Sequence, residues 1–138
     1  NRVADHDVWC GEGCEMGQVQ GLPRYFECHK GITATLQQSL PEAHSGLLVC
    51  GDQFYISQSE DERILALYPD ALAADMESAA IAQVCHSHHV PFSTVRIVSD
   101  SHDSDDSQQS SYRSFWQAHD EAFDAVRHAI AKVAACTI

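Results

Sequence analysis

The sequence has few basic residues and no long apolar run. Lys and Arg number 8 against 20 Asp and Glu in 138 residues, so the formal net charge is −12. A chain this acidic repels phosphate backbones and anionic lipids, and we therefore expect no nucleic-acid partner and no membrane-surface partner. Because no apolar run approaches the roughly 18 residues of a bilayer span, we also expect no transmembrane helix.

Cysteine is also sparse. The six cysteines are too few, in a chain of this length, for a domain held together by disulfides. Cys50 and Cys85 lie in apolar runs, where a free cysteine behaves as a small buried hydrophobic residue. We therefore expect reduced thiols and a cytoplasmic location. Cys10 and Cys14 could suggest zinc, but no second pair matches them, so we expect no metal and no cofactor.

The composition is that of one globular domain, with 44% hydrophobic and 20% charged residues. Spacing, glycines and prolines divide the chain into apolar segments. Strands are expected near Val3, over 46–51, 71–76 and 92–98. Helices are expected over 32–40, from a Ser59 cap to Tyr68, over 77–89 and over 112–135, with loops over most of 1–31 and over 99–111. In the helix over 77–89 the expected buried stripe is Ala80, Ile81, Val84 and Cys85.

This alternation of strands and helices predicts an α/β fold with a largely parallel sheet and helices on both faces. In such folds ligands gather at the carboxyl ends of the strands. Asp75-Met76-Glu77 and Ser99-Asp100 both stand where an expected strand ends. A carboxyl group half sheltered by apolar neighbours can act as a general acid, because desolvation raises its pKa. The alternative is that Glu77 only begins a helix and Asp100 only caps a loop.

Several motifs together resemble a known family. They are the stretch from Ala74 to His86 (ADMESAAIAQVCH), Val90-Pro91-Phe92, the stretch from Val95 to Asp100 (VRIVSD) and Gly51-Asp52-Gln53-Phe54-Tyr55. The segments 5–8 (DHDV) and 17–23 (GQVQGLP) add to the likeness. The chain is similar to the nucleoside phosphorylase superfamily, and within it to the bacterial 5′-methylthioadenosine/S-adenosylhomocysteine nucleosidases.

The resemblance implies roles in the reaction itself. Asp100 matches the acid that protonates adenine N7, and Ser99 the hydroxyl that positions it. Glu77 matches the carboxylate that binds the ribose hydroxyls, and Met76 the side chain that packs against the sugar. Asp75 stands among these binding residues, where the family usually has Glu.

The resemblance also implies the surroundings of the base and of the 5′-substituent. Phe54 matches the aromatic ring that stacks on the purine, and Tyr55 the next residue, whose backbone contacts the base. Arg96 matches an arginine that supports the acidic residues, and Tyr112 falls near an aromatic residue of the 5′-pocket. The segment 9–16 lacks aromatic residues by which the family reaches a neighbouring subunit's site, so the 5′-preference stays open.

The family's architecture is a three-layer sandwich whose mixed, largely parallel central sheet is flanked by helices. The resemblance implies that residues 1–138 form a single domain of this kind that lacks its N-terminal strands. It further implies a homodimer, or a complementing N-terminal segment, and a small-molecule nucleoside substrate. The implied activity is hydrolysis of the N-glycosidic bond with release of adenine. The alternatives are phosphorolysis of purine nucleosides and a non-catalytic nucleoside-binding or storage protein.

Overall fold

The structure is a computed structural model that describes residues 1–9, 11–54, 57–100, 115 and 120–136. The expectations for Tyr55, for Tyr112 and for the loop beyond Asp100 lie outside the described residues. The chain divides into two compact units. The first contains Asn1–His29 and His44–Thr94, and the second contains Lys30–Ala43 and Val95–Ile138.

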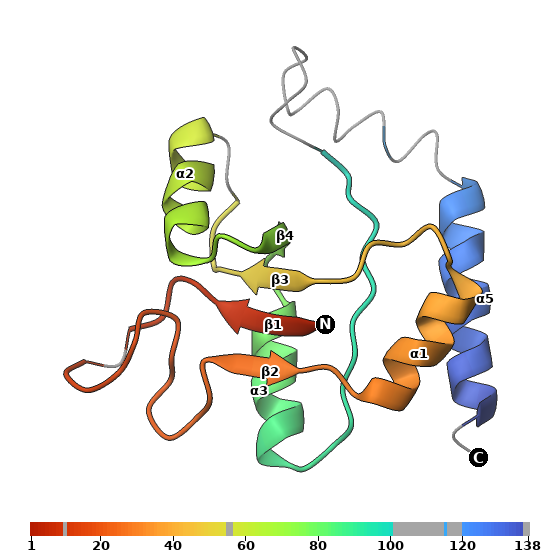
Figure 1. The fold of residues 1–138 in the computed structure, drawn as a ribbon, viewed down its shortest axis with the longest axis horizontal. Coiled ribbons are helices and arrows are strands. Elements are labelled where there is room, and N and C mark those ends of the chain that lie inside the picture. Colours follow the sequence, from red (N-terminus) through yellow and green to blue (C-terminus); the bar gives the residue numbers. More distant parts are fainter. Residues whose placement is uncertain (10, 55–56, 101–114, 116–119, 137–138) are drawn as a thin grey trace. The chain divides into compact units, whose positions relative to one another are not determined.

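The first unit is built on a sheet of four short strands (Figure 1). Their order is β2 (Tyr25–Glu27), β1 (Arg2–Asp5), β3 (Leu47–Cys50) and β4 (Ala71–Asp75). Strands β1, β3 and β4 are parallel, and β2 pairs antiparallel with β1 at one edge. The sheet is therefore mixed and largely parallel, which confirms the expected fold class.

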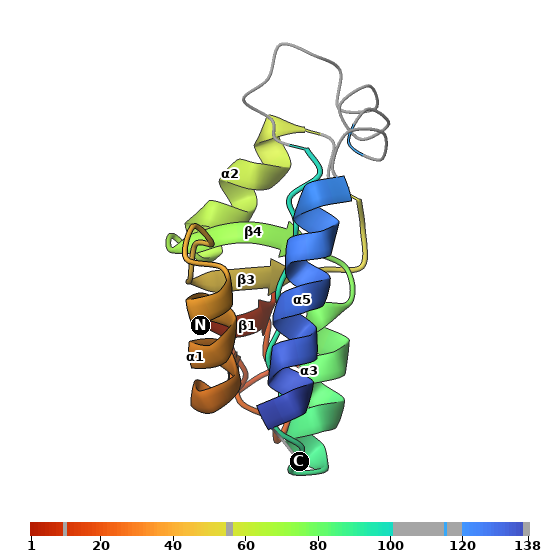
Figure 2. The ribbon, with the colours of Figure 1, turned by 90° about the vertical axis from the view of Figure 1, so that its right-hand side faces the viewer.

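Alternate residues of β1 and β3 point to opposite faces of this sheet, and each face carries one helix (Figure 2). On one face Val3, Leu48 and Cys50 pack with α3 (Ser78–Ser87). On the other face Ala4, Leu47 and Val49 pack with Ile64 of α2 (Gln58–Leu67) and with Tyr68, its C-cap. The first unit thus has the three layers that the sequence predicts.

The N-cap of helix α2 lies two residues before the expected Ser59 cap. It is Ser57, whose backbone N–H and hydroxyl both donate to the Glu60 carboxylate at 3.2 and 2.9 Å. Ser57 has extended backbone angles and a Glu three residues later, which is the arrangement that a cap requires. The helix ends at Tyr68, before Pro69, as predicted.

The described residues of the second unit form two helices that pack together (Figure 2), α1 (Lys30–Ser39) and α5 (Asp120–Cys136). The prediction of a short helix before Pro41 is confirmed, and the last helix is confirmed over residues 120–136. Phe115 is buried and meets the Phe123 ring edge to face, with 5.7 Å between ring centroids.

Three local expectations are wrong. Residues 92–98 contain no strand, because a strand needs a neighbour to pair with and β-branched residues alone cannot supply one. The short strand β2 interrupts the expected loop over 1–31. Helix α3 buries Ala79 and Ala82 against the sheet, whereas Ile81 and Val84 of the expected stripe are 48% and 61% exposed.

The cysteines follow the expectation in part. Cys28, Cys50, Cys85 and Cys136 are free thiols. Cys14 is in a disulfide, so the expectation of reduced thiols throughout is wrong at that residue. Within the described residues, no helix combines the length and the apolar character that a membrane crossing demands.

Candidate functional site

The carboxyl ends of three parallel strands meet at one edge of the first unit's sheet. Strand β1 ends at Asp5, β3 at Cys50 and β4 at Asp75, and Asp5 and Asp75 both pair with Cys50 in the ladder. The segments that follow these ends are Asp5–Val8, Gly51–Phe54 and Asp75–Ser78. They contain Phe54, Asp75, Met76 and Glu77, four of the side chains singled out by the sequence.

The Asp75 carboxylate holds the beginning of α3. One oxygen accepts a hydrogen bond from the Ser78 backbone N–H at 3.2 Å, and the other accepts one from the Ser78 hydroxyl. The Cys50 thiol contacts the same carboxylate and the Ala79 amide. The first backbone N–H groups of a helix lack partners within it, so these contacts satisfy donors that would otherwise be lost. Sequence reasoning missed this role, although Asp three residues before a buried Ser is a signal for it.

Burial changes the chemistry of Cys50. Desolvation, with the Asp75 carboxylate nearby, raises the pKa of the Cys50 thiol to about 12. The thiol is therefore neutral at physiological pH and serves as a packed donor rather than as a nucleophile.

Met76 and Glu77 project from the same edge toward solvent. Glu77 is the N-cap residue of α3, and both it and Met76 are exposed, Met76 by 44%. A carboxylate at a helix N-terminus lies at the positive end of the helix dipole, where a negative charge is stabilising. Glu77 thus begins a helix, as one interpretation had it, and also presents a carboxylate at the edge where ligands bind in such folds.

Phe54 is the aromatic residue of this edge. It lies in the segment after β3 and is 52% exposed. Two backbone N–H groups before it are held: Gly51 N donates to the Asp75 carbonyl at 3.1 Å, and Asp52 N donates to the Asp7 carboxylate at 2.8 Å. The segment that carries Phe54 is therefore tied to both neighbouring strand ends.

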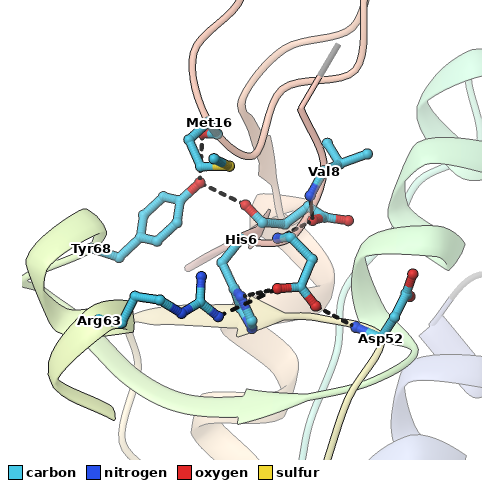
Figure 3. A network of polar contacts seen from close by, with 8 residues as sticks. His6, Val8, Met16, Asp52, Arg63 and Tyr68 are labelled. Carbon is cyan, nitrogen blue, oxygen red and sulfur yellow. Dashed lines mark hydrogen bonds and ion pairs between the residues drawn. The ribbon is translucent and has the colours of Figure 1, made fainter. Parts of the chain in front are cut away.

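A polar network surrounds the end of β1 (Figure 3). Asp7 Oδ1 lies 2.9 Å from Nδ1 of the fully buried His6 and 3.5 Å from an Arg63 guanidinium nitrogen. The side chain of Asp5 accepts hydrogen bonds from the backbone N–H groups of Asp7 and Val8 at 2.8 and 2.9 Å. Sequence reasoning assigned these residues no role, because the network joins segments that are far apart in the chain.

Tyr68 fixes the long segment between β1 and β2 to α2. Its buried hydroxyl donates to the Asp5 carbonyl at 2.6 Å, and the Arg24 Nε donates to that hydroxyl at 3.3 Å. The Arg24 guanidinium lies 4.6 Å from the centroid of the Tyr68 ring. Burial raises the pKa of the Tyr68 hydroxyl above its ordinary value, so it stays protonated and remains a donor.

The second unit contains three further residues singled out by the sequence, Arg96, Ser99 and Asp100. The Ser99 hydroxyl donates a hydrogen bond to Asp100 Oδ1, which is the contact expected of a positioning serine. Arg96 is an exposed residue of the same segment. Among the described residues of both units, no group of three or more His, Cys, Asp or Glu side chains gathers as metal ligands would.

Comparison with known proteins identifies relatives of this chain. A 5′-methylthioadenosine/S-adenosylhomocysteine nucleosidase of Staphylococcus aureus (strain MRSA252) is 40% identical over 92 residues, which is 64% of this chain and 40% of that protein. The chain also superposes on crystal structures of two further nucleosidases.

One structure is the 5′-methylthioadenosine/S-adenosylhomocysteine nucleosidase of Neisseria meningitidis in complex with methylthio-immucillin-A. Its TM-score is 0.81 at 30% identity, over 96% of this chain and 58% of that one. The other is the S-adenosylhomocysteine nucleosidase of Streptococcus pyogenes in complex with 5-methylthiotubericidin. Its TM-score is 0.73 at 33% identity, over 83% of this chain and 50% of that one.

This chain spans 40% of the curated Staphylococcus relative and about half of the solved structures it matches. The model of the Phosphorylase superfamily matches residues 1–137, nearly the whole sequence. Because this match covers nearly the whole sequence, the chain belongs to the Phosphorylase superfamily.

Proposed function

We propose that this chain belongs to a nucleosidase that hydrolyses the N-glycosidic bond of 5′-methylthioadenosine and S-adenosylhomocysteine and releases adenine. One observation carries the proposal. The exposed Phe54 and the Met76-Glu77 pair stand at the same edge of a parallel sheet, in a chain whose relatives bear the names of such nucleosidases. An aromatic ring beside a carboxylate can bind a base and a sugar together.

Asp100 is the proton donor in this proposal. It transfers a proton to adenine N7 as the bond between C1′ and N9 breaks, and water adds to C1′. Protonation makes the base a better leaving group while the ribosyl carbon becomes oxocarbenium-like. The hydrogen bond from Ser99 to Asp100 supports a fixed orientation of the acid.

The remaining residues bind and orient the substrate. Glu77 accepts hydrogen bonds from the ribose hydroxyls, and Met76 packs against the sugar. Phe54 stacks on the purine, and the backbone of Tyr55 contacts the base. Three further residues complete the set: Asp75, Arg96 and Tyr112. The bonds from Asp75 to Ser78 support a contribution through the beginning of α3, where Glu77 stands.

Assembly and location are part of the proposal. We place the enzyme in the cytoplasm as a homodimer, or in complex with a complementing segment. Four free thiols favour the cytoplasm, whereas the Cys14 disulfide is of a kind more common in oxidising compartments. Cell fractionation and sedimentation of the full-length protein test the two statements.

The test of the function uses Asp100→Asn. Residues 1–138 are co-expressed with the part of the Neisseria relative that has no counterpart in this chain, and adenine release from 5′-methylthioadenosine is assayed. Asp100→Asn should lower the rate by about 10²–10⁴-fold, as loss of one general acid does. Asp124→Asn is the matched control, because Asp124 pairs with Arg127 on the exposed side of α5.

The reaction's products separate hydrolysis from its rivals. Hydrolysis yields the free sugar in the absence of phosphate, whereas phosphorolysis requires phosphate and yields a sugar phosphate. Adenine binding with no release of adenine from the nucleoside by the assembled protein would indicate a storage protein. An Asp100→Asn variant with wild-type turnover would remove Asp100 from the mechanism.

A further inference from the structure

Asp7 joins its own segment after β1 to the segment after β3 and to α2. Its Oδ2 accepts a hydrogen bond at 2.8 Å from the backbone N–H of Asp52, which follows β3. Its Oδ1 faces His6 Nδ1 at 2.9 Å and the Arg63 guanidinium of α2 at 3.5 Å. Both carboxylate oxygens are therefore engaged, one with the segment after β3 and one with buried and cationic groups.

The backbone of β1 places Asp7 for this contact. Strands β1 and β3 are parallel neighbours, and the Asp5 carboxylate turns the chain by accepting the Asp7 and Val8 N–H groups. His6 is fully buried directly after the strand end, and its backbone N–H donates to the Cys50 carbonyl at 2.9 Å. Asp7 consequently stands beside the end of β3 on a fixed support.

Gly51 shows how closely the two segments approach. A Cβ atom at Gly51 would overlap the His6 ring and Asp7 Oδ2. Only glycine allows the chain to leave β3 in contact with these two side chains. The backbone N–H groups at this point are also hydrogen-bonded. Gly51 N–H donates to the Asp75 carbonyl, and Asp52 N–H donates to the Asp7 carboxylate.

We propose that Asp7 is a positioning residue that fixes the Gly51–Phe54 segment and, through it, the Phe54 ring. The consequence for purine binding rests on the proposed function, in which Phe54 stacks on adenine. Asn at this position has one acceptor oxygen in place of two. With the His6 proton on Nδ1, the tautomer in which His6 donates to Asp7, this oxygen cannot accept from both the Asp52 N–H and His6, and the Asn amide group would meet one of these donors.

The first readout is hydrogen exchange of single backbone amides, followed by NMR in residues 1–138. Residue Asp52 is exposed, but its backbone amide is hydrogen-bonded. In the wild-type protein this amide should therefore exchange at least roughly tenfold more slowly than an unstructured amide. Asp7→Asn should remove most of this protection. Asp70→Asn is the matched control, because Asp70 pairs with Arg2 at 2.7 Å near the beginnings of β1 and β4.

The second readout is the affinity of the assembled protein for adenine. It is measured by calorimetry in a double-mutant cycle with Phe54→Leu. If Asp7 acts through Phe54, Asp7→Asn should weaken adenine binding roughly tenfold or more in the wild type and far less in the Phe54→Leu background. Asp70→Asn should leave the affinity unchanged. A residue with a general structural role would instead weaken binding equally in both backgrounds.

The outcomes are separable. An unprotected Asp52 amide in the wild-type protein, or unchanged protection in Asp7→Asn, overturns the positioning role whether or not adenine binds. Because the first of these needs no variant, the idea stays testable even where Asp7→Asn does not fold. Additive losses in the cycle overturn the action through Phe54. Assembled wild-type protein that binds no adenine contradicts the proposed function alone, and the exchange data then decide the role of Asp7.

Discussion

At the scale of single residues, the acids at the carboxyl edge divide into two kinds. Asp7 and Asp75 direct both carboxylate oxygens to neighbouring protein groups. Glu77 lies two residues after Asp75 and is exposed at the beginning of α3. The first kind builds the edge, and the second kind is the proposed ligand for the ribose.

The proposed contact between Glu77 and the ribose hydroxyls can be tested by substitution. Glu77→Gln removes the charge and one acceptor oxygen, so it should weaken substrates with both ribose hydroxyls more than their 2′-deoxy analogues. A hydrogen bond to a charged group contributes roughly 1.5–3 kcal/mol, which is about tenfold to a hundredfold. The ratio of the two affinities, or of the two rates in the assembled protein, measures the effect. Equal losses on both substrates would show that Glu77 does not bind the hydroxyls.

The thiol of Cys50 makes a second prediction at this scale. With a pKa of about 12, it holds a far smaller thiolate fraction at pH 8 than an ordinary thiol. Alkylation by iodoacetamide at pH 8 should therefore be roughly a thousandfold slower at Cys50 than at the exposed Cys136. Mass spectrometry of the alkylated protein gives both rates, and similar rates would contradict the buried, neutral thiol.

The same pKa predicts how stability changes with pH. The unfolded thiol loses its proton near pH 8.5–9, about its ordinary value, whereas the folded thiol keeps its proton up to about pH 12. The unfolded state thus binds fewer protons in this window, and the free energy of unfolding falls as pH rises through it. Urea unfolding measures the free energy of unfolding at pH 7 and at pH 10. Its decrease between these two pH values should be smaller in Cys50→Ala than in the wild-type protein.

At the scale of elements, the long segment between β1 and β2 is fastened at Gly17. Its φ is +83°, and a Cβ atom there would overlap the Asp5 carbonyl oxygen and the Tyr68 hydroxyl. Gly13, with φ of +89°, has no atom within 4 Å of the same position. Both residues adopt left-handed backbone angles, but only at Gly17 do neighbouring atoms also leave no room for a side chain.

This pair separates backbone strain from close approach. Gly13→Ala should lower the free energy of unfolding by about 1–2 kcal/mol through strain alone. Gly17→Ala should lower it by at least about 2 kcal/mol more, because the methyl group displaces the bond from Tyr68 to Asp5. Urea denaturation of the two variants measures the difference. Equal costs would mean that the segment is not held against Tyr68.

Local sequence signals predict several elements well. The short apolar run before Gly51 is the buried strand β3, and acids in the first turn mark α2. The prediction of a strand over 92–98 is wrong, because a strand must pair with a neighbouring strand and no local sequence pattern reveals which strands are neighbours. The alanine-rich α3 offers two candidate faces, and only packing against the sheet selects the one with Ala79 and Ala82.

The candidate site is predictable to the same extent. Alternating strands and helices place Glu77 and the segment of Phe54 at strand ends, and both lie at the carboxyl edge. The contact from Asp7 to Asp52 spans 45 positions and depends on which strands are neighbours. Sequence order does not contain that information, so the residues that hold this edge escape prediction. The strand end expected at Ser99-Asp100 is absent from the structure.

At the scale of the whole molecule, the chain accounts for part of its relatives' length. Residues 1–138 match 58% of the Neisseria structure, so 42% of that protein has no counterpart in them. Among the described strands, β4 pairs with β3 alone and forms an edge of the sheet. An open edge is a surface to which further strands can add, so we expect residues 1–138 to self-associate or to bind a complementing segment.

Residues 1–138 alone should therefore show no appreciable release of adenine. The proposed proton donor Asp100 and ribose ligand Glu77 are present, but a base that activates water must lie within hydrogen-bond reach of it on a supported framework. Of the spare acids, Glu12 is exposed in the segment between β1 and β2, and Glu15 in that segment pairs with Arg24 at 2.7 Å.

The measurement compares adenine release by residues 1–138 alone with release after co-expression with the uncovered part of the Neisseria relative. Turnover should appear only in the assembled form and should disappear again with Asp100→Asn. The inactive protein alone should still show the protected Asp52 amide, because the contacts that protect it lie within the first unit. Robust turnover by residues 1–138 alone would place the water-activating group within this sequence and would make the further chain dispensable for catalysis.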